Sequence, residues 1–320
     1  MAGETDALPV GIVIVTHNSE PEIGACLDAA RATGAEVVVV DNASGDGTRE
    51  EVLRRGVRLI ANTANRGFAA AANQGISALQ VPFFLLLNPD AVILEGLPAL
   101  WRSCAEPGTG LAGGKLVDAG GRPQAGFAVR RFPTPAALVC EAILLNRLWP
   151  CNPVNWHYRC YDLDLNRKAE VDQPAGAFLM IRRSVWQQLG GFDEGFYPLW
   201  FEDVDFCRRA RSAGYAIRYV PEAVAKHTGG HSLRAVTLEI RTLYWYRSFL
   251  RYAAKHFRPW QRRLVSLGVI FGAAPRMLAG IVTSRTLRPI AVYGEVIRLA
   301  SLCFLSRRGF SAGEAGQVGE

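Results

Sequence analysis

The chain has 320 residues, of which 49% are hydrophobic and 20% are charged, and its formal net charge is +7. This composition supports a large buried core and excludes a mainly disordered chain. The seven cysteines are scattered without a CxxC pair, which argues against a zinc site or a disulfide framework and favours reduced thiols in a cytosolic protein.

Apolar runs alternate with helix-like segments along the first part of the chain. After MAGETDALPV, which lacks the basic flank of a signal peptide, strands and helices are expected in turn. The predicted strands cover 10–15, 36–40, 57–61 and 83–87, and the predicted helices cover about 21–33, 48–55 and an alanine-rich stretch up to 79. Continuous apolar runs that alternate with helices indicate a parallel sheet covered on both faces. The predicted fold class is therefore α/β with a mostly parallel central sheet.

Each predicted strand ends in a polar cluster, namely THN, DNAS, NTANRG and NPD. A single aspartate after a strand is more often a helix cap, but several aligned strand ends favour a ligand crevice at the carboxyl edge of the sheet. No GxGxxG follows the first strand, which argues against an NAD-type enzyme. The segment GTGLAGGK (108–115) departs from a phosphate loop at Thr109 and Leu116, so we interpret it as a turn that leads into a strand.

Eight segments, in order over about residues 8–235, resemble the successive motifs of family 2 glycosyltransferases. They are VIVTHN (13–18), VVDNASGDGT (39–48), NRGFAAAANQGI (65–76), LLLNPDA (85–91), GAFLMIRR (176–183), GGFDEGF (190–196), FEDVDFCRRAR (201–211) and HTGGHS (227–232). The series is most similar to the bacterial rhamnosyltransferases of cell-wall and O-antigen assembly. The resemblance implies a GT-A type fold and sugar transfer from a nucleotide diphosphate donor, by one in-line displacement with inversion.

The resemblance assigns the first strand ends to the nucleotide. It implies that Asp41 accepts a hydrogen bond from the pyrimidine base, whereas the residues alone fit an Asx turn equally well. Thr16, Asn18 and Asn65 would line the same pocket. Gly67 would let the backbone come close to the donor.

The fourth strand end is assigned to a metal. A divalent cation, Mg²⁺ or Mn²⁺, can neutralise the charge that develops on the departing diphosphate, and Asp90 is the candidate carboxylate for it. Asp90 corresponds to the last residue of the family's Asp-x-Asp motif, and Asn88 at the first position is a departure that leaves fewer charges for the metal. The resemblance also implies His227 as a metal or diphosphate ligand, although a lone histidine is usually structural. Arg182 and Arg183 could meet the diphosphate, but surface arginines are commonly just solvated.

A second carboxylate pair, Glu202-Asp203, follows the aromatic stretch GFYPLWF, which includes Trp200. A helix with an acidic first turn and a basic last turn would explain the charges without any function. The resemblance implies that Asp203 is the general base that takes the proton from the acceptor hydroxyl. Glu202, Trp200 and His231 are candidate acceptor contacts, and Asp205 is predicted to be structural.

The C-terminal quarter differs from the rest in charge. From Arg241 onward the chain has 13 basic and 3 acidic side chains, whereas residues 1–240 have 23 and 26. Aromatic residues and arginines alternate here, and the apolar run 264–282 is interrupted by Pro275 and Arg276, so a membrane span is not expected. An interfacial helix pair at an anionic membrane fits this pattern, and a helical subdomain packed on the core or on another subunit is the alternative.

These features predict a GT-A glycosyltransferase domain (1–237), a basic helical extension (238–310) and a disordered tail (311–320). The expected donor is dTDP-rhamnose and the expected acceptor is a glycan or lipid-linked intermediate, with UDP-galactofuranose, UDP-GlcNAc or UDP-glucose as alternative donors. We expect a cytoplasmic protein, peripheral at the inner face of the plasma membrane. A catalytically silent membrane-surface protein is a further alternative. Nucleic-acid binding is disfavoured because long apolar stretches lie among the C-terminal arginines.

Overall fold

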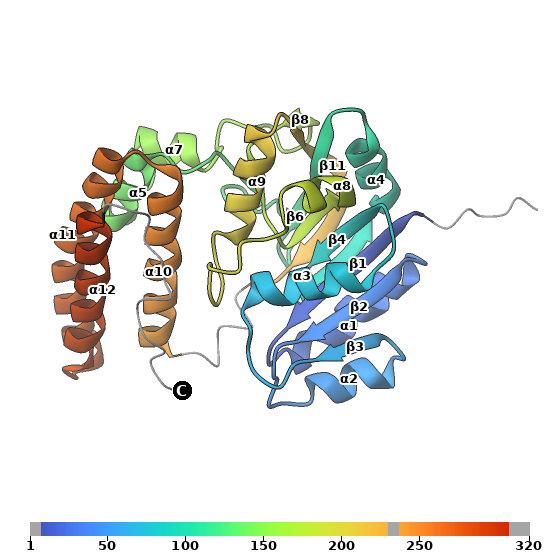
Figure 1. Cartoon of the computed structure of the whole chain (residues 1–320), viewed down its shortest axis with the longest axis horizontal. Coiled ribbons are helices and arrows are strands. Elements are labelled where there is room, and N and C mark those ends of the chain that lie inside the picture. The colour runs from blue at the N-terminus through green and yellow to red at the C-terminus, as the bar shows by residue number, and fades with distance from the viewer. Residues whose placement is uncertain (1–7, 230–236, 307–320) are drawn as a thin grey trace, which may run out of the picture.

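Nine strands form one sheet in the computed structural model, which describes residues 8–229 and 237–306 (Figure 1). The strand order is β3-β2-β1-β4-β10-β6-β11-β5, and β8 pairs with the outer side of β11. One half of the sheet, from β3 to β4, is entirely parallel. The fold therefore places the carboxyl ends of β1 to β4 along one edge, where a ligand crevice is expected.

The parallel half forms as the sequence pattern predicts. Its strands are β1 (Val10–Thr16), β2 (Glu36–Asp41), β3 (Arg58–Ala61) and β4 (Phe83–Leu87), and its helices are α1 (Glu20–Ala32), α2 (Thr48–Arg54) and α3 (Phe68–Ala78). Successive side chains of a strand point to opposite faces. In β1, Ile12 and Ile14 pack in one core cluster with α1, whereas Val13 and Val15 pack in another with α3. The continuous apolar runs thus reflect burial on both faces.

The other half of the sheet mixes strand directions. It consists of β5 (Ala91–Glu95), β6 (Thr109–Val117), β8 (Ala169–Glu170), β10 (Phe178–Arg182) and β11 (Ala216–His227). Strand β10 runs antiparallel between β4 and β6, and β5 runs antiparallel to β11 with Ala91 opposite His227. This register brings the end of β11 beside the residue that follows Asp90. The segment 108–115 forms the start of β6, as expected of a turn that leads into a strand.

Smaller elements complete the fold around the sheet. They are the two-stranded ladder β7 (Val129–Arg130) with β9 (Gln173–Pro174), and the helices α4 (Leu97–Ala105), α5 (Pro135–Ala142), α6 (Leu145–Leu148), α7 (Pro153–Tyr158), α8 (Arg183–Gln188) and α9 (Glu202–Ser212). Helix α9 packs on β9 and β11, so its first turn faces the same edge as the ends of β1 to β4. The predicted helix that begins at Glu202 is confirmed.

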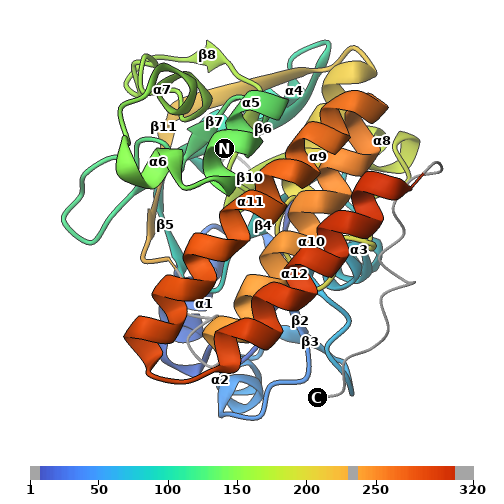
Figure 2. The same ribbon diagram turned by 90° about the vertical axis from the view of Figure 1, so that its left-hand side faces the viewer.

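Three C-terminal helices stand beside the strand ends (Figure 1) and run side by side (Figure 2). They are α10 (Leu238–His256), α11 (Pro259–Ser284) and α12 (Arg288–Leu305). Their core cluster includes Phe196, Val204 and Leu138 from the preceding part of the chain. The predicted boundary at residue 237 therefore falls within a shared core, and it stays a prediction.

Helix α11 continues through Pro275, the proline that interrupts the apolar run of the sequence. Packing of α11 on α5 and α12 outweighs the cost of an internal proline, which is about 3 kcal/mol. The packing on α5 is close: a Cβ at Gly272 would lie 1.9 Å from the carbonyl oxygen of Ala142. Any larger side chain at this position would push the two helices apart. The predicted disordered tail, 311–320, lies outside the described residues.

Candidate active site

The ends of β1 and β2 lie side by side and are buried. Thr16 pairs in register with Asp41, and the backbone N–H of Asn42 donates to the Thr16 carbonyl at 2.8 Å. The side chain of Asp41 is fully buried, whereas Thr16 is 1% exposed. Because the Thr16 hydroxyl has no hydrogen-bond partner among the described residues, it is a buried polar atom that a ligand could satisfy.

The Asp41 carboxylate is already held by protein groups. Its Oδ2 accepts the Arg49 guanidinium at 2.5 Å and the Ser44 backbone N–H at 3.1 Å, and the Ser44 hydroxyl donates to Oδ1. The contact to Ser44 is the Asx-type turn that the residues alone suggested. A buried carboxylate paired with an arginine is firmly placed, so Asp41 provides a fixed acceptor at the end of β2.

Asn18 and Asn65 fix the two loops beside Asp41. Asn18 has a left-handed backbone (φ 52°), and its side-chain oxygen accepts the Gly45 N–H at 2.8 Å. The side-chain oxygen of Asn65 accepts the Gly67 N–H at 2.9 Å. Asn42, which the sequence did not single out, donates to the Gly67 carbonyl at 3.0 Å and accepts from Asn62 at 3.1 Å.

Gly67 is needed for a contact within the protein. It has φ 81°, and a Cβ there would lie 2.9 Å from the Tyr197 ring and 3.2 Å from the Pro198 carbonyl oxygen. The Phe68 N–H donates to that carbonyl at 2.7 Å. The segment that comes close to Gly67 is thus the aromatic stretch before Glu202, which docks on the loop between β3 and α3 in the place where the sequence suggested a donor.

Asp90 and His227 come together although they are far apart in the sequence. The His227 Nε2 lies 3.4 Å from the Asp90 Oδ1, and both side chains are nearly buried. Gln124 donates its amide N–H to the His227 carbonyl at 2.7 Å, which orients its amide oxygen toward the His227 Nδ1 at 3.1 Å. In neutral His227 the proton therefore lies on Nδ1, and the lone pair of Nε2 faces the carboxylate.

The Asp90–His227 pair can supply part of the ligand shell of a divalent cation. It offers a carboxylate oxygen and an imidazole nitrogen, and no cluster of three or more His, Cys, Asp or Glu occurs in the described part of the chain. Mg²⁺ and Mn²⁺ usually keep several non-protein ligands, so diphosphate oxygens and water would complete the shell. Asn88 lies two residues before Asp90, and its side chain makes no hydrogen bond within residues 8–229 and 237–306. Phe127 stacks on the His227 ring with centroids 5.1 Å apart.

Asp203 lies at the first turn of α9 in a set of backbone donors. Its Oδ2 accepts the Gly176 N–H at 3.0 Å, and its Oδ1 accepts the Val204 N–H at 2.8 Å. Burial raises the pKa of Asp203, and these two hydrogen bonds together with the Arg130 charge oppose the increase. The result is a carboxylate whose proton affinity exceeds that of an exposed aspartate, as a general base requires.

Glu202 has a less favourable environment. It is 7% exposed, and its Oε2 has no hydrogen-bond partner in the described structure. Burial, followed by the neighbouring Asp203 charge, raises the pKa of Glu202 well above its usual range. A buried carboxyl that favours its neutral form can donate one hydrogen bond, which suits a contact to a sugar hydroxyl.

The two acidic positions lie at the same edge of the sheet. The Asn88 N–H donates to the Ala177 carbonyl at 3.1 Å, and the adjacent Gly176 N–H donates to Asp203. A short chain of backbone contacts therefore connects the loop that carries Asp90 with the first turn of α9. The geometry brings together the predicted donor, metal and base positions along one edge.

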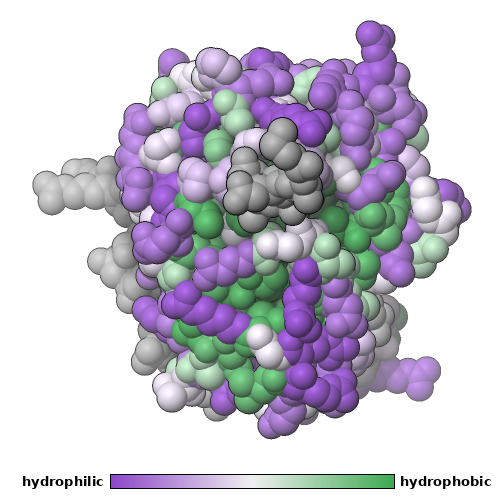
Figure 3. Space-filling view, turned by 90° about the vertical axis from the view of Figure 1, so that its right-hand side faces the viewer, coloured by the Kyte–Doolittle hydropathy of each residue, from purple (hydrophilic) through white to green (hydrophobic). Residues whose placement is uncertain are grey.

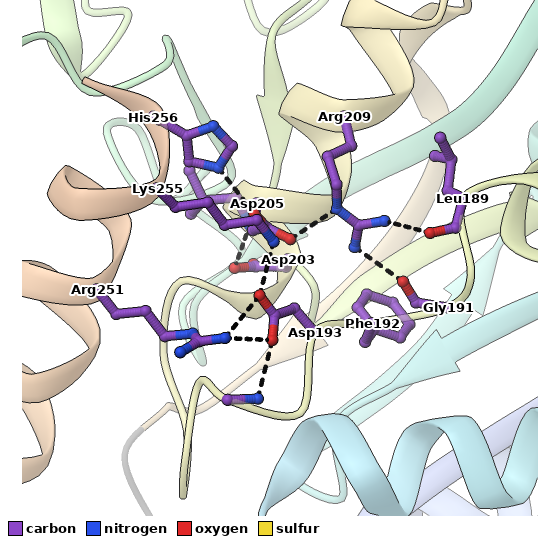
Figure 4. Close-up of polar contacts among 12 residues, drawn as sticks. Leu189, Gly191, Phe192, Asp193, Asp203, Asp205, Arg209, Arg251, Lys255 and His256 are labelled. Atoms are coloured by element: carbon purple, nitrogen blue, oxygen red, sulfur yellow. Dashed lines mark hydrogen bonds and ion pairs between the residues drawn. The ribbon is translucent and has the colours of Figure 1, made fainter. Parts of the chain in front are cut away.

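Asp205 confirms its predicted structural character through an ion network (Figure 4). Although burial raises the pKa of Asp205, the hydrogen bond to His256 and the charges of Arg209 and Lys255 lower it to about 2. Asp193 pairs with Arg251 and Lys255 at 2.7 and 2.6 Å. The contacts of Asp205 fasten α10 to α9, directly behind Glu202-Asp203, and those of Asp193 fasten α10 to the segment between α8 and α9.

Other sequence candidates lie elsewhere. Arg182 and Arg183 bind backbone carbonyls at the amino end of β4, because β10 runs antiparallel to β4. Neither guanidinium reaches the carboxyl edge. Trp200 has a left-handed backbone (φ 74°) and lines a separate cavity behind α9. His231 lies outside the described residues.

A loop beside the site carries functional residues that the sequence does not single out. Gln124 and Phe127 contact His227, and the Arg130 charge lowers the pKa of Asp203. All three residues come from the segment RPQAGFAVRRF. Their residue types follow no motif, and the loop reaches the site only because β7 pairs with β9. No signal within this single sequence identifies them.

Two family profiles match the chain. Residues 11–190 match glycosyl transferase family 2, and residues 153–305 match glycosyl transferase family group 2. Over 246 residues the chain is 32% identical to an N-acetylglucosaminyl-diphospho-decaprenol L-rhamnosyltransferase of Mycobacterium tuberculosis, which covers 71% of this chain and 78% of that protein. It is 30% identical over 208 residues to the low-salt glycan biosynthesis hexosyltransferase Agl10 of Haloferax volcanii, which covers 63% of this chain and 61% of that protein.

Solved structures share the fold at low identity. The mannosyltransferase PcManGT from Pyrobaculum calidifontis, in complex with GDP-Man and Mn²⁺, has a TM-score of 0.51 at 18% identity and covers 92% of this chain and 80% of that chain. Residues 1–349 of S. aureus TarS, in complex with UDP-GlcNAc, have a TM-score of 0.54 at 17% identity and cover 92% and 81%. The predicted α/β, GT-A type fold with C-terminal helices is confirmed.

Proposed function

The chain belongs to glycosyl transferase family 2, close to the rhamnosyltransferases, and on this premise we propose that it transfers L-rhamnose from dTDP-rhamnose. The proposed acceptor is a hydroxyl of N-acetylglucosamine carried on a polyprenyl diphosphate, the chemistry named for the mycobacterial relative. The observation that carries the proposal is the placement of Asp203 and the Asp90–His227 pair on one edge of the sheet.

In this mechanism Asp203 removes the proton from the acceptor hydroxyl as the oxygen attacks the anomeric carbon from the face opposite the nucleotide. The anomeric carbon is inverted, and the dTDP diphosphate leaves. The hydrogen bonds from Gly176 and Val204 hold the carboxylate in one orientation. Asp41 and Thr16 bind the nucleotide base at the ends of β2 and β1.

A divalent cation bound to Asp90 and His227 would neutralise the charge on the departing diphosphate. Gln124 fixes the His227 tautomer that such binding requires. Asn88, a neutral acceptor two residues away, would add an oxygen without charge. Mg²⁺ and Mn²⁺ are the ions that this ligand set fits.

The helical layer supports a membrane-surface location. Among the described residues α11 alone is long and apolar enough to cross a membrane, and part of it is buried in the protein. Its exposed side carries a continuous apolar stripe, the α11 stripe, formed by Trp260, Leu264, Leu267, Phe271, Leu278 and Val282. Arginines flank both helix ends, which suits an anionic lipid surface.

The opposite side of the molecule, toward the amino ends of the parallel strands, also shows apolar side chains within a mostly hydrophilic surface (Figure 3). That side is remote from the acceptor site, so we assign the membrane contact to the α11 stripe.

Leu267→Glu with Phe271→Glu should abolish sedimentation with anionic vesicles. Leu53→Glu with Leu94→Glu, at exposed leucines elsewhere, is the matched control. Vesicle binding that survives in the first pair, with a change in its solution mass, would instead assign the stripe to a second copy of the chain.

The donor is tested with a panel of nucleotide sugars and a short-chain polyprenyl-diphospho-GlcNAc acceptor, with Mn²⁺ present. We expect product only, or fastest, from dTDP-rhamnose, with a β-to-α type inversion at the anomeric carbon. Preference for UDP-galactofuranose, UDP-GlcNAc or UDP-glucose would replace the donor and keep the transferase. An absence of turnover with every donor, together with intact nucleotide binding, would favour a silent binding protein.

A further inference from the structure

A cavity of about 490 Å³ lies behind the first turn of α9, where the C-terminal helices meet α5 and α6. Its walls carry Arg147, Arg159, Arg241, Arg276, Trp200 and Tyr246, and we call it the arginine cavity. Glu141 is the one acidic residue among its lining residues. The cavity is therefore strongly basic and has aromatic walls.

Two of the arginines carry charge that none of the described residues compensates. Arg147 and Arg241 are exposed, and neither makes a hydrogen bond or an ion pair within the described residues. Arg276 is held in place by the backbone carbonyls of Glu141 and Ala142. The Glu141 carboxylate accepts the Asn146 amide at 2.8 Å and forms no ion pair with the lining arginines of the described chain. Among the described residues that line it, the cavity thus has four arginines and one carboxylate, that of Glu141.

Tyr246 provides an independent sign of a ligand. Its side chain is 2% exposed, yet its hydroxyl has no hydrogen-bond partner in the described structure. An unpaired buried hydroxyl is costly unless a bound group satisfies it. Burial raises the pKa of Tyr246 to about 12, so the hydroxyl stays protonated and can donate to an anion at neutral pH.

The larger neighbouring cavity, of about 770 Å³, shows what a structural set of arginines looks like. There Arg131 pairs with Asp162, and Arg211 pairs with Glu170 and Asp172. These two guanidinium groups are neutralised within the protein, and Arg208, which also lines that cavity, donates to the Tyr252 hydroxyl at 2.8 Å. The same comparison singles out the arginine cavity as the place where an external anion would be bound.

We propose that the arginine cavity binds the diphosphate of the lipid-linked acceptor and so sets the position of its sugar in front of Asp203. Guanidinium forks bind phosphate oxygens in pairs, which a diphosphate can satisfy at several positions. Trp200 lines the cavity and precedes Asp203 by three residues, a span of at most about 10 Å of chain. One sugar, placed between the diphosphate in the cavity and the hydroxyl at Asp203, can bridge a distance of that size.

This assignment rests on the proposed transfer to a lipid-linked sugar and extends it by naming the residues that recognise the lipid phosphate. Arg276 belongs to α11, the helix whose opposite side carries the α11 stripe. A diphosphate in the cavity would therefore lie on the protein side of a membrane-bound helix. The isoprenoid chain then has a short path to the lipid.

The test is the double variant Arg147→Gln with Arg241→Gln, assayed for transfer in the intact protein. We expect the KM for polyprenyl-diphospho-GlcNAc to rise by about 10- to 100-fold, with kcat and the donor KM unchanged. Tyr246→Phe should raise the same KM by a smaller factor. Arg31→Gln with Arg102→Gln removes the same charge from exposed positions on α1 and α4 and should leave all three constants unchanged.

A binding assay distinguishes the lipid diphosphate from a general anionic surface. Phosphatidylcholine vesicles that contain farnesyl diphosphate are compared with vesicles that contain phosphatidylglycerol at equal charge. If the Arg147→Gln with Arg241→Gln variant loses binding only to the vesicles that contain farnesyl diphosphate, the assignment is supported. An equal loss of binding to both kinds of vesicle overturns it. Arginine-dependent binding of farnesyl diphosphate without any transfer would keep the cavity and reject the proposed function. Transfer by the double variant with an unchanged acceptor KM would keep the proposed function and reject the arginine cavity as the diphosphate site.

Discussion

The donor side and the acceptor side of the site are built differently. On the donor side, formed by the loops after β1, β2 and β3, the Thr16 hydroxyl has no partner among the described residues, but the other site side chains are paired: Asp41 with Arg49, Asn18 with Gly45, and Asn65 with Gly67. On the acceptor side, formed by the first turn of α9 and the arginine cavity, Glu202 and Tyr246 are buried without full partners. Arg147 and Arg241 carry charge that the described residues do not neutralise.

The difference shows how each half prepares for its ligand. The donor side is held rigid before any ligand binds, which reduces the cost of ordering on binding. The acceptor side keeps buried donors and cations that only a bound ligand can satisfy. The substrate that arrives second would thus complete the interactions around the reacting oxygen.

Asp203→Asn, on the acceptor side, should have the largest effect on the rate of transfer. Because the amide cannot take up the hydroxyl proton, kcat should fall by about 10²- to 10⁴-fold, while the affinity for dTDP stays the same. The shape of the side chain and an oxygen for the Gly176 N–H are kept. Steady-state kinetics together with calorimetry of dTDP binding provide the measurement. Wild-type kcat in this variant would exclude Asp203 as the base.

Asp90→Ala tests the metal on the donor side. With Mn²⁺ present, dTDP affinity should decrease by about 100-fold, since the cation loses its one protein carboxylate. The effect should disappear in excess chelator, because the wild type then lacks the ion as well. Gln124→Ala, which frees the His227 tautomer, should weaken Mn²⁺ binding by about tenfold. Equal Mn²⁺-dependent affinity in Asp90→Ala and wild type would contradict the assignment.

The same contrast explains what could be predicted from sequence. The parallel half was predictable because each strand is a continuous buried run that ends in a polar turn, so Asp41 and Asp90 stand out locally. The metal pair and the acceptor side depend on pairings between distant segments, such as Ala91 with His227 and β7 with β9. No local pattern placed Gln124 or Arg130 near the site.

Proline and glycine gave the least reliable signals. The local preference of Pro275 is to end a helix, but the packing of α11 outweighs it. Gly67 is expected to let the backbone come close to the donor, and its neighbours in the structure are Tyr197 and Pro198. In both cases the deciding contact is made by residues far away in sequence.

Asp205→Asn and Glu202→Gln should change stability in opposite directions. The folded-state pKa of Asp205, about 2, lies below the unfolded value of about 3.9, so Asp205 contributes about 2–3 kcal/mol above pH 4 that is lost as pH falls toward 2. Asp205→Asn should therefore lower the free energy of unfolding at pH 7 by about 3 kcal/mol. Glu202 has a raised pKa, so its charge costs stability as pH rises above its unfolded value, and Glu202→Gln should raise the melting temperature at neutral pH.

Thermal unfolding between pH 3 and 8 measures both effects. Glu95→Gln, at an exposed position at the end of β5, is the control and should change the free energy of unfolding by less than about 0.5 kcal/mol. If Glu202→Gln is the more destabilising of the two substitutions, then Glu202 is paired in the folded protein and the contrast between the two sides is wrong.

Arg130→Met should produce the smallest effect, a shift in pH dependence without loss of the maximal rate. The Arg130 charge lowers the pKa of Asp203, which burial raises. Removing that charge should raise the pKa further, so kcat/KM should begin to fall at a higher pH as the medium is acidified. At alkaline pH, where Asp203 is fully ionised, variant and wild type should agree. Arg122→Met, an exposed position on the same loop, should leave the profile in place. A profile that moves to lower pH in Arg130→Met would mean that the titrating base is a group other than Asp203.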